Sequence, residues 1–535
     1  MKEKRERMIW FGFLLLCCAV LVVSTLTLMN RKEDWFIDEY YSYGCANNEA
    51  GRGLDFEDGR AYTPEELERM AAEAYGVTEE GRFRYDIVWN NLAGNVHPPL
   101  FYALLHTVCS LTPGGYSVWQ GAAVNLLFAL VCLYFFQLLA RGLTKSEWTA
   151  GILTLAWTCC IGLYADVTLL RDYMAATCGV TASAWACFRY LRGKRGIPDL
   201  ARIAAASAFA ALSHYYCLIY LFFLCGVLCV ILLARKAWRN LLGVVLAEGC
   251  AAAAAVAVFP AMVWRLLFSS RGAEAVENLT DSSLSSLGER IAYFYREVNE
   301  HFFGGLLWAL GILLVIAAAV RLAAARKRKA PPERGEASVT LTAAEGCLLI
   351  LPGCAFFLLV SKIAAYLALR YMLPVTPVLF LSAAAAMLLL LKRQPKERLL
   401  AGIAAGVMLV LGCLSWTAGS VDKLYIGRQE KIRSKLEPYQ GTEAVVLWQN
   451  RNFMSVGLSQ YRYFSTVTFY NDAPENMPEE IPVLKEGRRA VLLLGTDGYE
   501  DYLERLKELY PGYKVKSLGK LDGQNKFRDY LFVPK

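Results

Sequence analysis

The stretch MIWFGFLLLCCAVLVVSTLTLMN, residues 8–30, is long enough and apolar enough to cross a lipid bilayer as a helix. It follows the basic segment MKEKRER, and no small-residue cleavage site separates it from the next residues, RKEDW. We therefore interpret it as an uncleaved membrane anchor rather than a signal peptide. Similar apolar runs recur along the 535 residues, of which 56% are hydrophobic. The composition predicts a polytopic helical membrane protein.

Basic residues next to the apolar runs predict the orientation of the chain. Lys and Arg flanks are retained on the cytoplasmic side, and such flanks occur as MKEKRER, RGLTK, RGKR, ARKAWR, ARKRKAPPERGE and LKRQPKER. We expect a multi-pass protein of the plasma membrane with a cytoplasmic N-terminus and an extracytoplasmic C-terminal domain. These flanks account for most of the net charge of +8 and form no continuous stripe, so no nucleic-acid partner is expected.

The 16 cysteines lie mostly within apolar runs and have no metal-ligand spacing, so they indicate small buried side chains.

Pairing the apolar runs predicts a mainly α, polytopic helical membrane fold with about 11–13 transmembrane helices. The transmembrane domain is expected over residues 1–416, with external loops at 30–97 and 265–302, followed by a small extracytoplasmic α/β domain at 417–535. In this last part, alternating and apolar patterns predict strands in EAVVLWQ, STVTFY, RRAVLLLG, YKVKSLG and DYLFVPK. The segment GYEDYLERLKELYPG predicts an amphipathic helix.

Two apolar pieces lie between the external residues 30–97 and the cytoplasmic Arg141, and only one of them can cross the membrane. HPPLFYALLHTVCSL, residues 97–111, is short and contains two prolines near its start, so we expect it to be re-entrant, interfacial or only partly spanning. This places His97 at a cavity. Earlier in the same external region, TPEELERMAAEAYG predicts a helix with Thr63 as N-cap and Glu66 completing a capping box. That helix fits the membrane surface, and the alternative is an ordinary solvated loop helix.

Polar residues gather in the outward turns of this topology. FIDEYYSYG, residues 36–44, places Asp38 and Glu39 immediately after the first crossing. A carboxylate there can accept a proton from a hydroxyl nucleophile, while cations can hold a phosphate leaving group. Each residue alone also fits a structural role, such as a snorkelling arginine, and their convergence favours a site. The other polar residues expected at this site are His97, Asp166, Arg171, Tyr173, His214, Tyr215, Tyr216, Lys362, Arg370 and Tyr371.

Four motifs in this order, DEYYS, HPPLFYALLH, RDYM and RYMLPVTP, resemble those of the GT-C glycosyltransferases. The most similar branch is the family 39-like group that holds the protein O-mannosyltransferases and the lipid A aminoarabinose transferase. The resemblance covers the whole membrane part, and the C-terminal α/β domain is similar to that of the aminoarabinose transferase.

The resemblance implies a polyprenyl-phosphate-linked sugar as donor, a hydroxyl of a glycan, lipid or protein as acceptor, and inverting transfer on the outer face. Asp38 matches the catalytic aspartate of the first loop, and Glu39 matches its acidic neighbour. His97 falls where the aminoarabinose transferase has a lysine near the lipid phosphate, and Arg370 falls near another phosphate-contacting cation.

The third motif departs from the Gln-Glu-Ala-Arg string of many relatives. Arg171 and Tyr173 remain, and Asp166 is the candidate for the second acid. The motifs require no cofactor and leave a divalent metal ion open.

A transporter or flippase of a lipid-linked sugar, and a polymerase or ligase of lipid-linked glycans, are the alternative functions. Both would use a polar cavity and phosphate-binding cations. We find no inverted repeat in the sequence, and a large ordered first loop favours an enzyme over a transporter.

Overall fold

The computed structural model describes residues 2–32, 35–51, 53–193, 195–268, 270–280, 284–327, 338–394, 396–424, 426, 429–449, 454–495, 498–520 and 527–535. These residues form two compact units, each built from three segments. The helical unit comprises Met1–Thr27, Leu92–Phe101 and Ala122–Leu424; the mixed unit comprises Leu28–Asn91, Tyr102–Gly121 and Tyr425–Lys535. Most of the basic segment ARKRKAPPERGE, expected in a cytoplasmic loop, lies outside the described residues.

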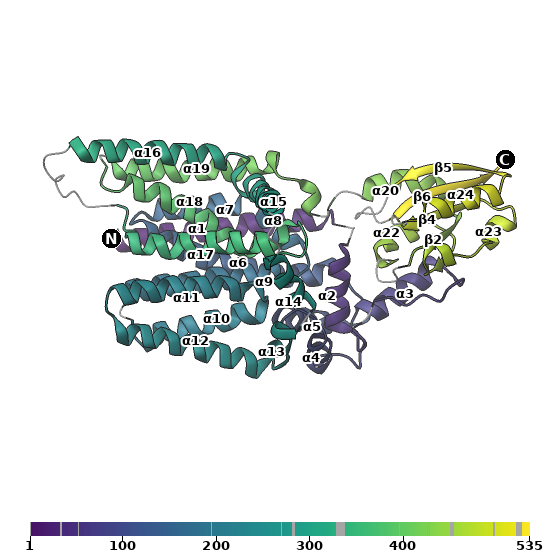
Figure 1. The fold of residues 1–535 in the computed structure, drawn as a ribbon, viewed down its shortest axis with the longest axis horizontal. Helices are drawn as coiled ribbons and strands as arrows, with labels where there is room; N and C mark the ends of the chain where they lie inside the picture. Colours follow the sequence, from purple (N-terminus) through teal and green to yellow (C-terminus); the bar gives the residue numbers. More distant parts are fainter. Residues whose placement is uncertain are drawn as a thin grey trace. The chain divides into compact units, whose positions relative to one another are not determined.

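The helical unit consists of long helices with short turns between them (Figure 1). Its core is α9, which packs against α10, α11, α17 and α18 and is buried along nearly its whole length. The elements of this unit, with α1 and α6 continuing into the other unit, are α1 (Lys2–Met29), α6 (Val118–Leu143), α7 (Glu147–Thr158), α8 (Ile161–Thr168), α9 (Tyr173–Arg192), α10 (Ile197–Ser213), α11 (Tyr216–Ala234), α12 (Trp238–Val258), α13 (Ala261–Phe268), α14 (Ser270–Thr280), α15 (Leu284–Phe303), α16 (Leu307–Lys327), α17 (Ala343–Ile363), the 3-10 helices η1 (Leu369–Tyr371) and η2 (Leu373–Val375), α18 (Thr376–Leu391), α19 (Glu397–Ala418) and η3 (Val421–Leu424).

Within the described residues, seven helices are long and apolar enough to cross a membrane, or nine if two bent pairs each count as one span. The bent pairs are α7 with α8, at 57°, and α15 with α16, at 86°. Two further expected crossings, α9 and α10, are less apolar or shorter: α10 has 17 residues, and α9 carries Thr, Ser and Cys. Because other helices cover α9, its surface does not need to suit lipid. The chain is a multi-pass membrane protein.

The mixed unit holds a six-stranded sheet of order β1-β3-β2-β4-β6-β5. The pairs β3–β2 and β2–β4 are parallel, and the outer pairs are antiparallel. Its elements are α2 (Ile37–Asn47), β1 (Ala61–Tyr62), α3 (Pro64–Tyr75), α4 (Tyr85–Ala93), α5 (Leu100–Leu111), α20 (Gln429–Leu436), η4 (Glu437–Tyr439), β2 (Glu443–Leu447), η5 (Ser455–Gly457), α22 (Leu458–Tyr461), β3 (Val467–Tyr470), η6 (Pro474–Asn476), α23 (Pro482–Lys485), β4 (Ala490–Gly495), α24 (Glu500–Leu509), β5 (Tyr513–Gly519) and β6 (Phe527–Pro534). Helices α4 and α5 continue into the helical unit.

The sheet takes one strand from the segment that follows α1. Ala61 pairs with Thr468 and Tyr62 with Val467, so β1 lies antiparallel to β3. The sequence places the domain boundary at residue 416, whereas in the structure residues 28–91 form part of the same compact unit as the C-terminal region. The five strands and the helix predicted for the C-terminal region are all present.

The loop helix α3 begins as the sequence predicts, with one difference. The Thr63 hydroxyl accepts the backbone N–H of Glu66 at 3.2 Å. The Glu66 carboxylate does not return to the N-cap and instead forms an ion pair with Arg60. The apolar piece around His97 also forms a short helix, α5, of 12 residues, which is too short to cross a bilayer.

Candidate functional site

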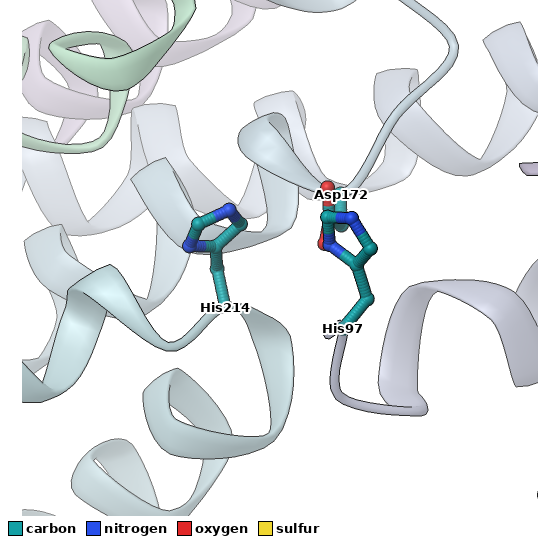
Figure 2. Close-up of side chains that lie close together, drawn as sticks. All are labelled: His97, Asp172 and His214. Atoms are coloured by element: carbon teal, nitrogen blue, oxygen red, sulfur yellow. The ribbon is translucent and has the colours of Figure 1, made fainter. Parts of the chain in front are cut away.

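Three ionisable side chains converge in the helical unit, from three different turns (Figure 2). His97 lies between α4 and α5, just before Pro98 and Pro99. Asp172 is the residue before α9, and His214 ends α10. His97 and His214 are 117 positions apart in the chain, and the turns bring them together. The candidate ligand atoms of the three residues lie within 4.8 Å of one another.

Arg171 and Asp172 fix the orientation of His97. The Nη2 of Arg171 lies 2.9 Å from Nε2 of His97, and Nδ1 of His97 lies 2.9 Å from Oδ2 of Asp172. A guanidinium can only donate, so Nε2 of His97 accepts and its Nδ1–H donates to Asp172. The result is a chain of charge-assisted hydrogen bonds, Arg171 to His97 to Asp172.

Burial and neighbouring charges set the protonation states of Asp172 and His214. The Asp172 side chain is 0% exposed. Burial raises the pKa of Asp172, but its contacts with His97, His214 and Arg171 outweigh that effect and hold the pKa below its usual range. Burial lowers the pKa of His214 to about 4, against the opposing effect of Asp172. Near neutral pH the cluster therefore holds an ionised carboxylate and an uncharged His214.

Aromatic rings surround His214 and extend the cluster toward Arg370. The ring centroid of Tyr173 is 5.1 Å from that of His214, and Tyr371 contacts both Tyr173 and Tyr216, at 6.4 and 5.5 Å. The guanidinium of Arg370 lies 5.3 Å from the ring of Tyr371. The expected residues His97, Arg171, Tyr173, His214, Arg370 and Tyr371 are thus connected within one unit.

The cluster fits a metal ion by distance but not by its hydrogen bonds. Two imidazoles and a carboxylate are a common donor set for zinc and related ions. However, Arg171 occupies Nε2 of His97, and Nδ1 of His214 accepts the Tyr216 amide at 3.1 Å. A ligating imidazole carries its proton on the nitrogen that does not bind the metal. A metal ion would require Arg171 to leave and His214 to give up the Tyr216 amide. We therefore assign no step to a metal.

The two adjacent carboxylates of the mixed unit lie in different environments. Glu39 lies 3.0 Å from the ammonium of Lys32, and both side chains are 0% exposed. Its other oxygen accepts the backbone N–H of Phe36 at 2.8 Å, which caps α2. Asp38, one residue earlier in the same first turn, is partly exposed. Glu39 therefore has a defined structural task, and Asp38 is the carboxylate that a substrate could reach.

The tyrosines of FIDEYYSYG anchor α2 within the mixed unit. Trp35 stacks on Tyr40 at 5.2 Å, and Tyr40 contacts Tyr75 of α3 at 4.9 Å. The hydroxyl of Tyr43 donates to the carbonyl of Ser117 at 2.6 Å. These contacts hold the first turn of α2, and with it Asp38, in a fixed position.

The remaining expected site residues lie in other settings. Asp166 accepts the Thr177 hydroxyl at 2.5 Å and is 2% exposed, so it joins α8 to α9. Burial raises the pKa of Tyr215 to about 12, and the charge of Arg265 opposes this. Lys362 lies in the last turn of α17 and is partly exposed.

Sequence reasoning passed over Asp172, the acid that the cluster contains. The signal was present in the motif RDYM, where Asp172 stands between Arg171 and Tyr173. The search for a second acid followed the position of the family's Gln-Glu-Ala-Arg string and so led to Asp166.

No family model matches the sequence, and no curated protein sequence matches it. Among solved structures, the chain is similar to ArnT from Cupriavidus metallidurans bound to undecaprenyl phosphate, with a TM-score of 0.51 and 14% identity over 97% of this chain and 98% of that chain. The apo state of ArnT gives a TM-score of 0.51 and 13% identity over the same shares. The oligosaccharyltransferase of Archaeoglobus fulgidus in the apo form gives 0.45 and 11%, over 95% of this chain and 69% of that chain.

The coverage of ArnT in both directions shows a shared fold over nearly the entire length of the two chains. The GT-C fold expected from the motifs is confirmed. At this level of identity, the likeness is one of fold.

Proposed function

We propose that this protein is an integral-membrane glycosyltransferase. It moves a sugar from a polyprenyl-phosphate donor to a hydroxyl acceptor on the outer face of the membrane, with inversion at the anomeric carbon. The observation that carries the proposal is the Arg171–His97–Asp172 chain of hydrogen bonds, which lies beside His214. A further support is the fold shared with ArnT, which has been crystallised with undecaprenyl phosphate.

The cluster suits the phosphate of the donor. Arg171 is permanently charged and has further N–H groups in a fork that matches phosphate oxygens. His214, uncharged and bonded through Nδ1 to the Tyr216 amide, carries its proton on Nε2 and can donate it in a hydrogen bond. Asp172 does not bind the phosphate; it orients His97, which in turn contacts Arg171. Arg370 is a second cation for the same group.

The chemical step is a displacement at the anomeric carbon. By the motif resemblance, Asp38 is the base that takes the proton from the acceptor hydroxyl, and the oxygen forms a bond to the anomeric carbon. The bond between that carbon and the phosphate oxygen breaks, and its electron pair leaves with the lipid phosphate. Attack from the face opposite the leaving group gives inversion. Negative charge grows on the phosphate, so cations placed there stabilise the transition state more than the ground state.

The test measures binding of undecaprenyl phosphate, as a probe, to the purified protein in nanodiscs. Charged hydrogen bonds contribute roughly 1.5–3 kcal/mol, so Arg171→Gln and Arg370→Gln should each weaken binding about 10- to 100-fold. Arg239→Gln, which removes the same charge from an exposed position at the start of α12, should leave binding unchanged.

Parental binding by both cluster variants would overturn the proposed donor site. Arg370 is partly exposed, so its variant is expected to fold even if Arg171→Gln, which alters a residue only 5% exposed, does not. A protein that binds the probe and moves lipid-linked sugar across the bilayer, with no covalent product by mass spectrometry, would be a transporter instead.

A further inference from the structure

A cavity of about 660 Å³ lies where α6 ends, α9 ends and α10 begins. All of its lining belongs to the helical unit. The helix α9 has the His97 cluster at its first residue and this cavity at its last turns, and 20 residues of α-helix span about 30 Å. The cavity therefore lies at the other end of the bundle from the proposed donor site and is separate from it.

The walls of the cavity are apolar and aromatic. Leu138 of α6 and Trp185 and Phe188 of α9 line it. The close approach of α6 requires a glycine, because a Cβ on Gly142 would come within 2.4 Å of the Phe188 ring. Such walls suit hydrocarbon, and they do not suit a soluble anion alone.

Arginines form the polar side of the cavity, and two of them share one carboxylate. Oδ1 of Asp199 accepts from Nε of Arg189 at 3.2 Å and from Nη1 of Arg202 at 2.7 Å. The side chains of Arg189 and Arg202 are 50% and 39% exposed. Two positive charges thus face one negative charge, and the remaining N–H groups of both guanidiniums make no hydrogen bond to the described residues.

The other two arginines of the lining have carboxylates of their own. Arg192 forms a two-bond pair with Glu345, at 2.7 Å for each bond, and lies 4.4 Å from the Phe188 ring. Arg141 lies 2.6 Å from Glu147. Arg189 and Arg202 therefore supply the excess positive charge of the cavity.

We propose that this cavity binds an anionic membrane phospholipid, with its phosphate at Arg189 and Arg202 and its acyl chains along Leu138, Trp185 and Phe188. The charge, the apolar walls and the place at the helix ends all match a lipid at the membrane boundary. Basic pockets between transmembrane helices on the cytoplasmic side are typical sites for anionic head groups. The positive-inside prediction places these turns, which contain RGLTK and RGKR, on that side. The inference does not depend on the proposed glycosyltransferase function.

The test uses native mass spectrometry and nanodiscs of defined composition with the full chain. The parent should retain phosphatidylglycerol in preference to phosphatidylcholine. The double variant Arg189→Gln/Arg202→Gln should bind phosphatidylglycerol at least about tenfold more weakly, since two charge-assisted bonds are lost. Arg235→Gln/Arg239→Gln removes the same charge from exposed positions near the turn between α11 and α12, and it should bind like the parent.

A second variant guards against loss of folding, because the double variant leaves Asp199 without its arginines. Leu138→Trp keeps every ion pair and narrows the apolar side of the cavity, so it should also weaken retention of the lipid while the melting temperature stays near that of the parent. Parental binding by a folded Leu138→Trp variant would overturn the proposal. Equal losses in the control pair, equal binding of phosphatidylcholine, or complete competition by inorganic phosphate would overturn it as well.

Discussion

Asp38 and Glu39 are adjacent in the chain and have opposite environments, which separates their roles. Asp38→Asn is nearly isosteric but cannot accept a proton. We expect it to fold, to bind undecaprenyl phosphate like the parent, and to lose at least about 10² in transfer rate, the usual lower value of general-base help. Binding and sugar transfer should be measured separately on the same preparation. Transfer at the parental rate would show that Asp38 is not the base.

Glu39→Gln makes the same carboxylate-to-amide change at the next position, where the expected effect is on stability. It leaves the Lys32 ammonium buried without its carboxylate, and breaking a buried ion pair costs about 3–5 kcal/mol. We expect a large drop in the melting temperature of the Glu39 variant and little change for Asp38→Asn. The reverse order would contradict the assignment of Glu39 as the residue that holds the first turn of α2.

The lowered pKa of His214 predicts how the stability of the fold changes as the pH falls. Burial lowers its pKa from 6.5 to about 4, so the unfolded chain binds the proton more readily than the folded one. The stability that neutral His214 contributes is therefore complete above about pH 6.5 and is lost as the pH falls toward 4. Asp172 faces it and has a lowered pKa, so the contribution of Asp172 is lost only below this range.

We expect the melting temperature of the parent in detergent to fall between pH 6.5 and pH 4, and that of His214→Gln to fall less. Tyr216→Phe keeps the imidazole and its bond to the backbone amide, so it should follow the parent. An unchanged slope in His214→Gln would assign the acid sensitivity to other groups.

Among the helices and strands, the sequence predicts those that local residue patterns determine. The strands β2 to β6 and helix α24 follow from alternation, apolar runs and amphipathic spacing, and α3 follows from Thr63 and Pro64. The two-residue strand β1 carries no pattern of its own, because its pairing with Thr468 and Val467 depends on residues about 400 positions away. The Glu66 carboxylate could complete the N-cap or pair with Arg60, and tertiary packing decides between them.

In the candidate site too, the sequence predicts which residues take part but not which residues pair with each other. Histidine, arginine and tyrosine could be selected from the sequence because they stand in turns beside apolar runs. The partners of each could not be selected, since Asp166 and Asp172 are both acids near the same turn. Only the packing of α8 on α9 directs Asp166 to Thr177, and leaves Asp172 to His97.

At the scale of the whole molecule, the two ends of α9 carry different chemistry. Its first residue adjoins the His97 cluster, and its last turn carries Arg189 and Arg192, which line the cavity. If the cluster faces outward and the arginines face the cytoplasm, a donor lipid and an anionic phospholipid would meet the same helix from opposite leaflets. Both proposals therefore depend on the orientation of the chain.

The orientation can be tested with labels on three segments. We expect a tag after Lys535 and a cysteine at Glu80 to react from outside, and a cysteine within residues 328–336 to react from inside, in a background without the exposed native cysteines. The reasoning is that the first crossing runs outward from a basic N-terminus, and that α5, at 12 residues, does not add a crossing. A C-terminal tag that reacts only after permeabilisation would show that the parity is wrong. In that case the assignment of Asp38 to the outer face and of the arginine-lined cavity to the cytoplasmic face would both lose their basis.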